Sequence, residues 1–85
     1  MKVQLHPHAV QRLIERGTTE EEVVVTVREG EKFPAKFGRI GFRRNFANNR
    51  EWHGRQYANK QVEAYAVEED EKGSWLVITI IVKYF

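Results

Sequence analysis

The stretch Ser74–Tyr84, with the sequence SWLVITIIVKY, carries the strongest secondary-structure signal in the chain. Its near-continuous apolar run and its β-branched residues favour an extended strand. Because apolar residues occupy both faces of such a strand, we expect it to lie in the middle of a sheet. The run is also too short to span a bilayer.

The segment before it has the pattern of a partner strand. Residues alternate along Gln61–Val67, which places Val62, Ala64 and Ala66 on one side and Glu63, Tyr65 and Val67 on the other. An acidic turn over Glu68–Gly73 connects the two segments, so residues 61–84 are predicted to form a hairpin. Further strands are expected at Met1–His6, Ile40–Phe46 and Trp52–Tyr57, with turn chemistry at Asn48-Asn49.

Two helices are expected between the first strand and the rest. The first runs from about His8 to Arg16, because Pro7 suits the first helical position and Gly17 suits a left-handed C-cap. Its predicted buried face holds Ala9, Val10, Leu13 and Ile14. The second runs from Thr19 to about Glu29, with a capping box of Thr19 and Glu22 and a stop at Gly30. Its predicted buried stripe is Val23, Val24 and Val27.

The order of these elements predicts a single α+β domain over residues 1–85. Two N-terminal helices pack on one face of an antiparallel sheet of about four strands. The other face of the sheet is expected to be partly exposed and to carry the basic strands.

The composition excludes several classes of site. The 85-residue chain is 41% hydrophobic and 31% charged, which is typical of a globular domain, and it has no cysteine. Disulfide scaffolds and cysteine-based metal sites are therefore excluded, and the absence of a glycine-rich phosphate loop predicts no cofactor. Residues His6, His8 and His53 lack the spacing of a zinc site, so no metal is expected. Without a signal-peptide pattern or a membrane span, the expected location is the cytoplasm.

The charge is unevenly distributed along the chain. Residues 15–31 carry six acidic and two basic side chains, which gives −4, whereas residues 32–62 carry eight basic and one acidic, which gives +7. A middle segment this basic is typical of a surface that binds an anion such as RNA, DNA or an acidic protein. The alternative is a solvated set of strands in a basic protein.

Two constellations could carry chemistry. His8 and Arg12 share a helical face, with Arg16 one turn further. Such a group is suited to acid–base catalysis on a phosphodiester. The alternative is that these residues form the ordinary polar face of a helix. Phosphate binding is expected at Arg39, Arg43 and Arg44, which interleave with Phe37, Phe42 and Phe46. The alternative is that these phenylalanines form core and the arginines its rim. Lys60, a charged residue of a strand near the C-terminus, is also expected to contact RNA.

A run in the N-terminal half resembles a known family. The pattern His8-Ala9-x-x-Arg12-x-x-x-Arg16-Gly17-x-Thr19-x-Glu21-x-Val23, together with the final Trp75-Leu76-Val77-Ile78-Thr79, is similar to the family catalogued as domain of unknown function 4258. That family is similar to the BrnT and RelE toxins. The resemblance implies two helices on an antiparallel sheet and cleavage of RNA without a metal, by attack of a 2′-hydroxyl on its own phosphate. It points to His8 and Arg12 as catalytic residues and to a small antitoxin-like partner.

Two functions therefore stay open. One is a metal-independent endoribonuclease of toxin–antitoxin type, in which His8 is general acid or base and Arg12 and Arg43 bind phosphate. The other is a non-catalytic module that binds RNA or a protein through the basic strands. The first requires that the folded chain bring His8 and Arg12 to a concave surface that also receives Arg43 or Arg44.

Overall fold

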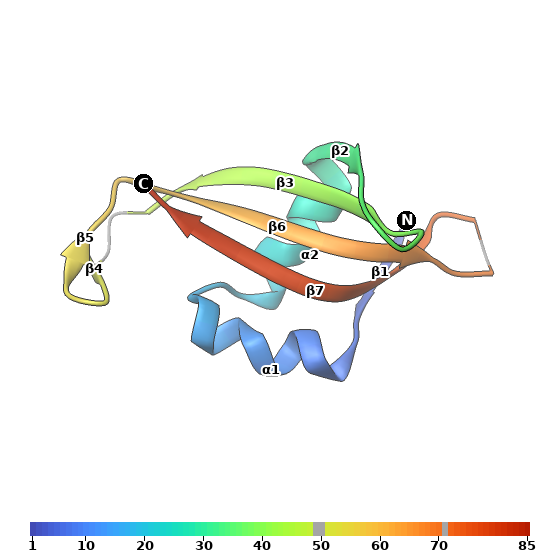
Figure 1. Cartoon of the computed structure of the whole chain (residues 1–85), viewed down its shortest axis with the longest axis horizontal. Helices are drawn as coiled ribbons and strands as arrows, with labels where there is room; N and C mark the ends of the chain where they lie inside the picture. The colour runs from blue at the N-terminus through green and yellow to red at the C-terminus, as the bar shows by residue number, and fades with distance from the viewer. Residues whose placement is uncertain (49–50, 71) are drawn as a thin grey trace.

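The computed structural model describes residues 1–48, 51–70 and 72–85. Figure 1 shows two helices on one side of a long twisted sheet, with a small hairpin beyond its end. Along the chain the elements are β1 (Lys2–Leu5), α1 (Pro7–Arg16), α2 (Glu20–Glu29), β2 (Glu31–Pro34), β3 (Ile40–Ala47), β4 (Glu51–Trp52), β5 (Arg55–Gln56), β6 (Asn59–Glu68) and β7 (Ser74–Tyr84). The α+β class and the two helices are thus confirmed.

The main sheet has five strands in the order β1-β7-β6-β3-β2. β6 and β7 form the expected hairpin, and β7 lies between β6 and β1. The sheet is mixed, because β1 runs parallel to β7 while the other neighbours are antiparallel. The expectation of about four antiparallel strands therefore differs from the structure in strand number and in the direction of β1. Lys2 pairs with Ser74 at the far end of the chain, so no local turn signal encodes that pairing.

The helix ends follow the sequence signals. Gly17 takes the left-handed conformation after α1, with φ of 76°, and its N–H donates to the carbonyls of Leu13 and Ile14. Thr19 and Glu22 form the capping box at the start of α2. These two motifs define a tight turn between the helices, which places Gly17 and Thr18 beside the end of the sheet.

The helices cover one face of the sheet, here called the helix-covered face. α2 lies against β6 and β3, and α1 lies against β7. The core between them holds Ala9, Val23, Val27, Phe42, Val62, Ala64, Ala66, Trp75, Val77 and Ile80, all buried. The predicted alternation along β6 is confirmed, since its three apolar residues at even positions are completely buried.

The predicted buried face of α1 is partly wrong. Ala9 is completely buried and Leu13 packs on the core, but Val10 is 46% and Ile14 is 89% exposed. α1 contacts mainly β7 and the short β1. A helix lying on so narrow a support buries a single i, i+4 row, and residues one position further point past it.

The segment after β3 forms the small β4–β5 hairpin. Its turn is His53-Gly54, where His53 has φ of 50° and Gly54 has φ of 80°. The predicted strand over Trp52–Tyr57 is therefore two short strands. Of the predicted Asn48-Asn49 turn, Asn49 lies outside the described residues. Neither helix of the described chain is long and apolar enough to cross a membrane.

Candidate nucleic-acid interface

The second face of the sheet has no helix on it, and in Figure 1 no helix passes in front of β3, β6 and β7. Cross-strand partners share a face of a sheet, so the pairing registers define which side chains stand there. We call this surface the open face; its side chains are Glu31, Phe33, Arg43, Asn45, Gln61, Glu63, Tyr65, Thr79, Ile81 and Lys83. It mixes cations, carboxylates, amides and aromatic rings, and its rings come from Phe33 and Tyr65 rather than from the predicted Phe42 and Phe46.

A carboxylate lies at the centre of the open face. The Glu63 side chain is only 5% exposed. Its carboxylate accepts a hydrogen bond of 2.7 Å from the Tyr65 hydroxyl and forms an ion pair of 3.0 Å with the Lys83 ammonium. Burial by itself raises the pKa of Glu63, but these hydrogen bonds and the charges of Lys83 and Arg43 outweigh it and lower the pKa. Glu63 therefore stays ionised and holds two polar neighbours in place.

Two aromatic rings, Phe33 and Tyr65, lie on the same face as this carboxylate. The Arg43 guanidinium sits 4.6 Å from the centroid of Phe33 and also pairs with Glu31. Phe33 meets Tyr65 edge to face at 5.9 Å. Gly41 makes this possible, because a Cβ at that position would lie 2.3 Å from the Phe33 ring. The open face thus presents a cation over an aromatic ring at its β2 edge.

A pocket of about 420 Å³ opens at one end of this face, beside the β2–β3 turn. We call it the aromatic pocket; it is lined by Phe33, Pro34, Ala35, Lys36, Phe37, Arg39, Tyr65, Thr79 and Ile81. Its only charged lining residues are Lys36 and Arg39, and neither has an ion pair among the described residues. The hollow is therefore apolar inside and cationic at its rim.

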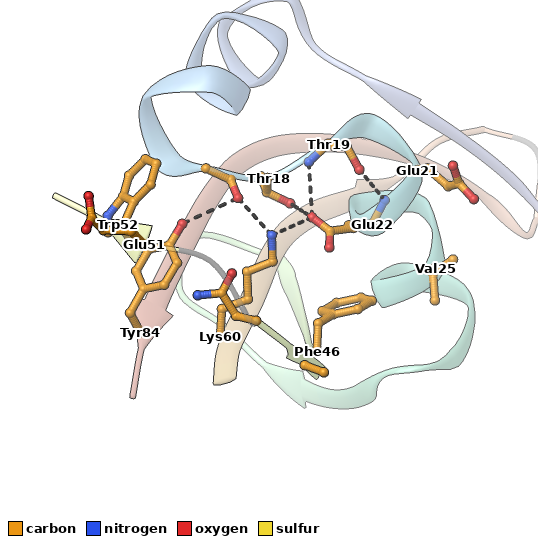
Figure 2. A pocket seen from close by; sticks show the side chains of 13 residues that line it. Thr18, Thr19, Glu21, Glu22, Val25, Phe46, Glu51, Trp52, Lys60 and Tyr84 are labelled. Atoms are coloured by element: carbon orange, nitrogen blue, oxygen red, sulfur yellow. Dashed lines mark hydrogen bonds and ion pairs between the residues drawn. The ribbon is translucent and has the colours of Figure 1, made fainter. Parts of the chain in front are cut away.

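A larger cavity, of about 700 Å³, lies at the other end of the molecule on the helix-covered side (Figure 2). We call it the α1–α2 pocket; it is lined by Gly17, Thr18, Thr19, Glu21, Glu22, Val25, Phe46, Ala47, Asn48, Glu51, Trp52, Lys60 and Tyr84. Among the described residues, three carboxylates and one ammonium line it. An excess of negative charge opposes the binding of phosphate.

The polar groups of the α1–α2 pocket are engaged with one another. Lys60 is buried, and its ammonium donates at 2.8 Å both to Glu22 Oε1 and to the Gly17 carbonyl. The Tyr84 hydroxyl donates to the Arg16 carbonyl at 2.6 Å, and burial together with Glu22 raises its pKa, so it remains a donor. Trp52 stacks on Tyr84 at 5.0 Å. These contacts tie the helix turn to β6 and β7.

The sequence-predicted catalytic pair lies elsewhere. His8 is exposed on α1 and stacks on His6, whose Nδ1 accepts from the His8 backbone N–H at the helix cap. Arg12 is exposed and donates to Glu15 at 2.8 Å; this hydrogen bond and the charge of Glu15 raise the pKa of Arg12. Arg16 is exposed too, and only its carbonyl is seen to engage the sheet.

The predicted phosphate-binding arginines are divided between surfaces. Arg43 stands on the open face, Arg39 lines the aromatic pocket, and Arg44 points to the helix-covered face, 3.7 Å from Glu29 at the end of α2. Consecutive residues of a strand point to opposite faces, so Arg43 and Arg44 cannot serve one surface. Phe42 is core, Phe46 packs on it, and Phe37 is exposed.

The predicted meeting of His8 and Arg12 with Arg43 or Arg44 is therefore not formed among the described residues. Lys60, the predicted RNA contact of β6, has its ammonium bonded to Glu22 and to the Gly17 carbonyl inside the α1–α2 pocket. His53 stacks on Trp52, away from His6 and His8. No group of three or more possible metal ligands occurs in the part of the chain that the structure describes.

Comparisons with protein-family models, curated proteins and solved structures give no match to this chain. The resemblance to the family catalogued as domain of unknown function 4258 therefore stays a sequence-based prediction. The site has to be argued from its own geometry.

The central residues of the open face were not predicted to lie together. Phe33, Glu63, Tyr65 and Thr79 lie far apart in sequence and come together only through the β2–β3–β6–β7 registers. The alternation along Gln61–Val67 was the one available signal, because it assigned Glu63 and Tyr65 to the side away from the core.

Proposed function

We propose that this chain is a non-catalytic module that binds single-stranded RNA on its open face. The observation that carries the proposal is the uncovered strand surface, on which Arg43 lies over Phe33 and Tyr65 adjoins Lys83 through Glu63. Flat rings accept unpaired bases by stacking, and arginine and lysine pair with phosphates. An extended strand surface also offers contacts to several successive nucleotides of a single strand.

The charge of this surface favours an anionic partner. The open face and its adjoining turn carry Lys36, Arg39, Arg43 and Lys83 against Glu31 and Glu63, a net charge of +2. Arg43 and Lys83 already have carboxylate partners, so Lys36 and Arg39 are the cations most free to meet phosphate. Affinity is therefore expected to depend on salt with a modest slope.

The test is fluorescence polarisation of a labelled, short mixed-sequence RNA against the purified protein at several salt concentrations. Arg39→Ala is expected to weaken binding, and Arg28→Ala, at an exposed arginine of α2, is the matched control. Equal loss in both variants would indicate a general charge effect, and no binding by the wild-type protein at low salt would refute the proposal.

The endoribonuclease of toxin–antitoxin type stays a prediction from the resemblance. Its two catalytic candidates, His8 and Arg12, lie on the outer side of α1 rather than with the open-face cations. An antitoxin-like partner is likewise a prediction. RNA cleavage in the presence of EDTA that is lost in His8→Ala would establish the enzyme and replace the binding-module proposal.

A further inference from the structure

The β2–β3 turn exposes an aromatic side chain. Phe37 is 87% exposed, and its backbone lies in the left-handed region with φ of 61°. A bulky side chain rarely takes that conformation, and an exposed ring gains little from folding. The neighbouring Gly38, with φ of 70°, has no such penalty. Positive φ at both central residues is what a two-residue hairpin turn requires, and His53-Gly54 shows the same pair of angles. The feature that points to a ligand is therefore the exposed ring.

The ring of Phe37 stands at the mouth of the aromatic pocket. Phe33 and Tyr65 form an edge-to-face pair in the wall, and Thr79 supplies a hydroxyl from β7. Phe33, Tyr65 and Phe37 thus line a single hollow of about 420 Å³ whose lining is largely apolar. A hollow of this size suits a single planar ring system rather than a long apolar segment.

The cations that line the pocket favour a ligand with negative charge. Lys36 and Arg39 flank Phe37 in sequence and line the same hollow, and none of its described lining residues is a carboxylate. Arg39 is only partly exposed, and its backbone bonds with Ala35 and Lys36 close the turn on which both cations stand. A ligand that fits therefore has a flat apolar part to enter and negative charge on both sides of it.

We propose that the aromatic pocket binds one unpaired nucleobase of the RNA strand, with Phe37 stacked on the base and with Lys36 and Arg39 holding the flanking phosphates. This inference rests on the proposed function, because the base arrives as part of a strand bound to the open face. Arg43 and Lys83 lie further along the same face and meet the continuation of the strand.

The test compares two RNA probes of equal length and charge, one with bases and one whose ribose–phosphate backbone lacks them, by fluorescence polarisation. The wild-type protein is expected to bind the base-containing probe roughly 5- to 150-fold more tightly, the range for stacking of one base on an aromatic ring. Phe37→Ala is expected to remove most of that preference and to leave the affinity for the abasic probe unchanged.

Two controls make the outcomes distinct. Ile14→Ala removes an equally exposed apolar side chain from α1 and is expected to change neither affinity. Phe37→Tyr keeps the ring and is expected to retain the preference. Equal binding of both probes by the wild-type protein would overturn the base pocket while leaving RNA binding intact. Binding of neither probe would overturn the proposed function itself.

Discussion

The two hollows of this molecule differ in what their side chains do. In the α1–α2 pocket the buried ammonium of Lys60 has two partners at 2.8 Å, and the Tyr84 hydroxyl is bonded to a carbonyl. In the aromatic pocket, Phe37 is exposed on a left-handed backbone and the two lining cations have no ion pair among the described residues. The polar groups of the larger hollow are thus bonded within the fold, whereas the exposed ring and the cations of the smaller one stay open for the RNA that we propose as ligand.

The larger of the two hollows is therefore not the one that we propose as the binding site. A buried ion pair requires compensation by further hydrogen bonds, and the helix turn supplies it through Gly17 and Thr18. An exposed ring with unpaired cations has no comparable reason within the fold. The comparison predicts that substitutions at the first site change stability and that substitutions at the second change binding.

Lys60→Met is expected to have the largest effect on stability. It leaves the Glu22 carboxylate and the Gly17 carbonyl without their donor in a partly buried site. We expect a loss of about 3 kcal/mol, the lower end of the range for a broken buried pair. Arg12→Met, at a pair whose side chains are 56% and 58% exposed, should leave the free energy of unfolding almost unchanged. Urea denaturation measures both, and equal losses would show that the α1–α2 pocket has no special structural role.

Phe37→Gly is expected to change RNA binding but not to lower stability. Glycine takes a positive φ without steric cost, so the free energy of unfolding should stay constant or rise by less than about 1 kcal/mol. RNA affinity should fall at the same time, as for a position that trades stability for binding. A clear loss of stability in urea would mean that Phe37 supports the fold instead.

Glu63→Gln tests the carboxylate at the centre of the open face. Because the folded-state pKa of Glu63 is lowered, its contribution is complete above the ordinary glutamate pKa of about 4.3 and is lost as the pH falls through the folded-state value. The variant should be less stable than the wild-type protein by about 1–2 kcal/mol at pH 7. That difference should shrink below about pH 4, and thermal denaturation across this range would detect it. A difference independent of pH would assign the effect to packing.

The salt dependence of RNA binding is the smallest expected effect. A single-stranded ligand contributes a slope of about −0.7 per phosphate contact in a plot of log affinity against log salt. Contacts from Lys36 and Arg39 alone give about −1.4, and all four cations give about −2.8. Polarisation titrations in Lys36→Ala should show a slope about 0.7 shallower than that of the wild-type protein. An unchanged slope would remove Lys36 from the phosphate-binding set.

Local signals predicted much of the fold. Pro7, Gly17, the Thr19–Glu22 capping box and the alternation along β6 act within a few residues, and each appears in the structure as expected. The parallel pairing of β1 and the narrow contact of α1 depend on distant packing, which no local pattern encodes. Val10 and Ile14 were mispredicted for that reason.

The candidate site was less accessible to sequence reasoning. Composition drew attention to the basic middle segment, but strand alternation separates Arg43 from Arg44, and the fold keeps α1 away from both. Phe37 was named only as one member of an aromatic pattern. Its exposure, which singles it out, exists only in the folded chain.

The most direct test of RNA binding on the open face is an NMR titration of isotope-labelled protein with a short single-stranded RNA. Amide shifts are expected at the open-face residues of β3, β6 and β7 and at residues 36–39, with α1 and the turn between α1 and α2 unchanged. Shifts concentrated at His8 and Arg12, or an absence of shifts at low salt, would contradict the proposed function.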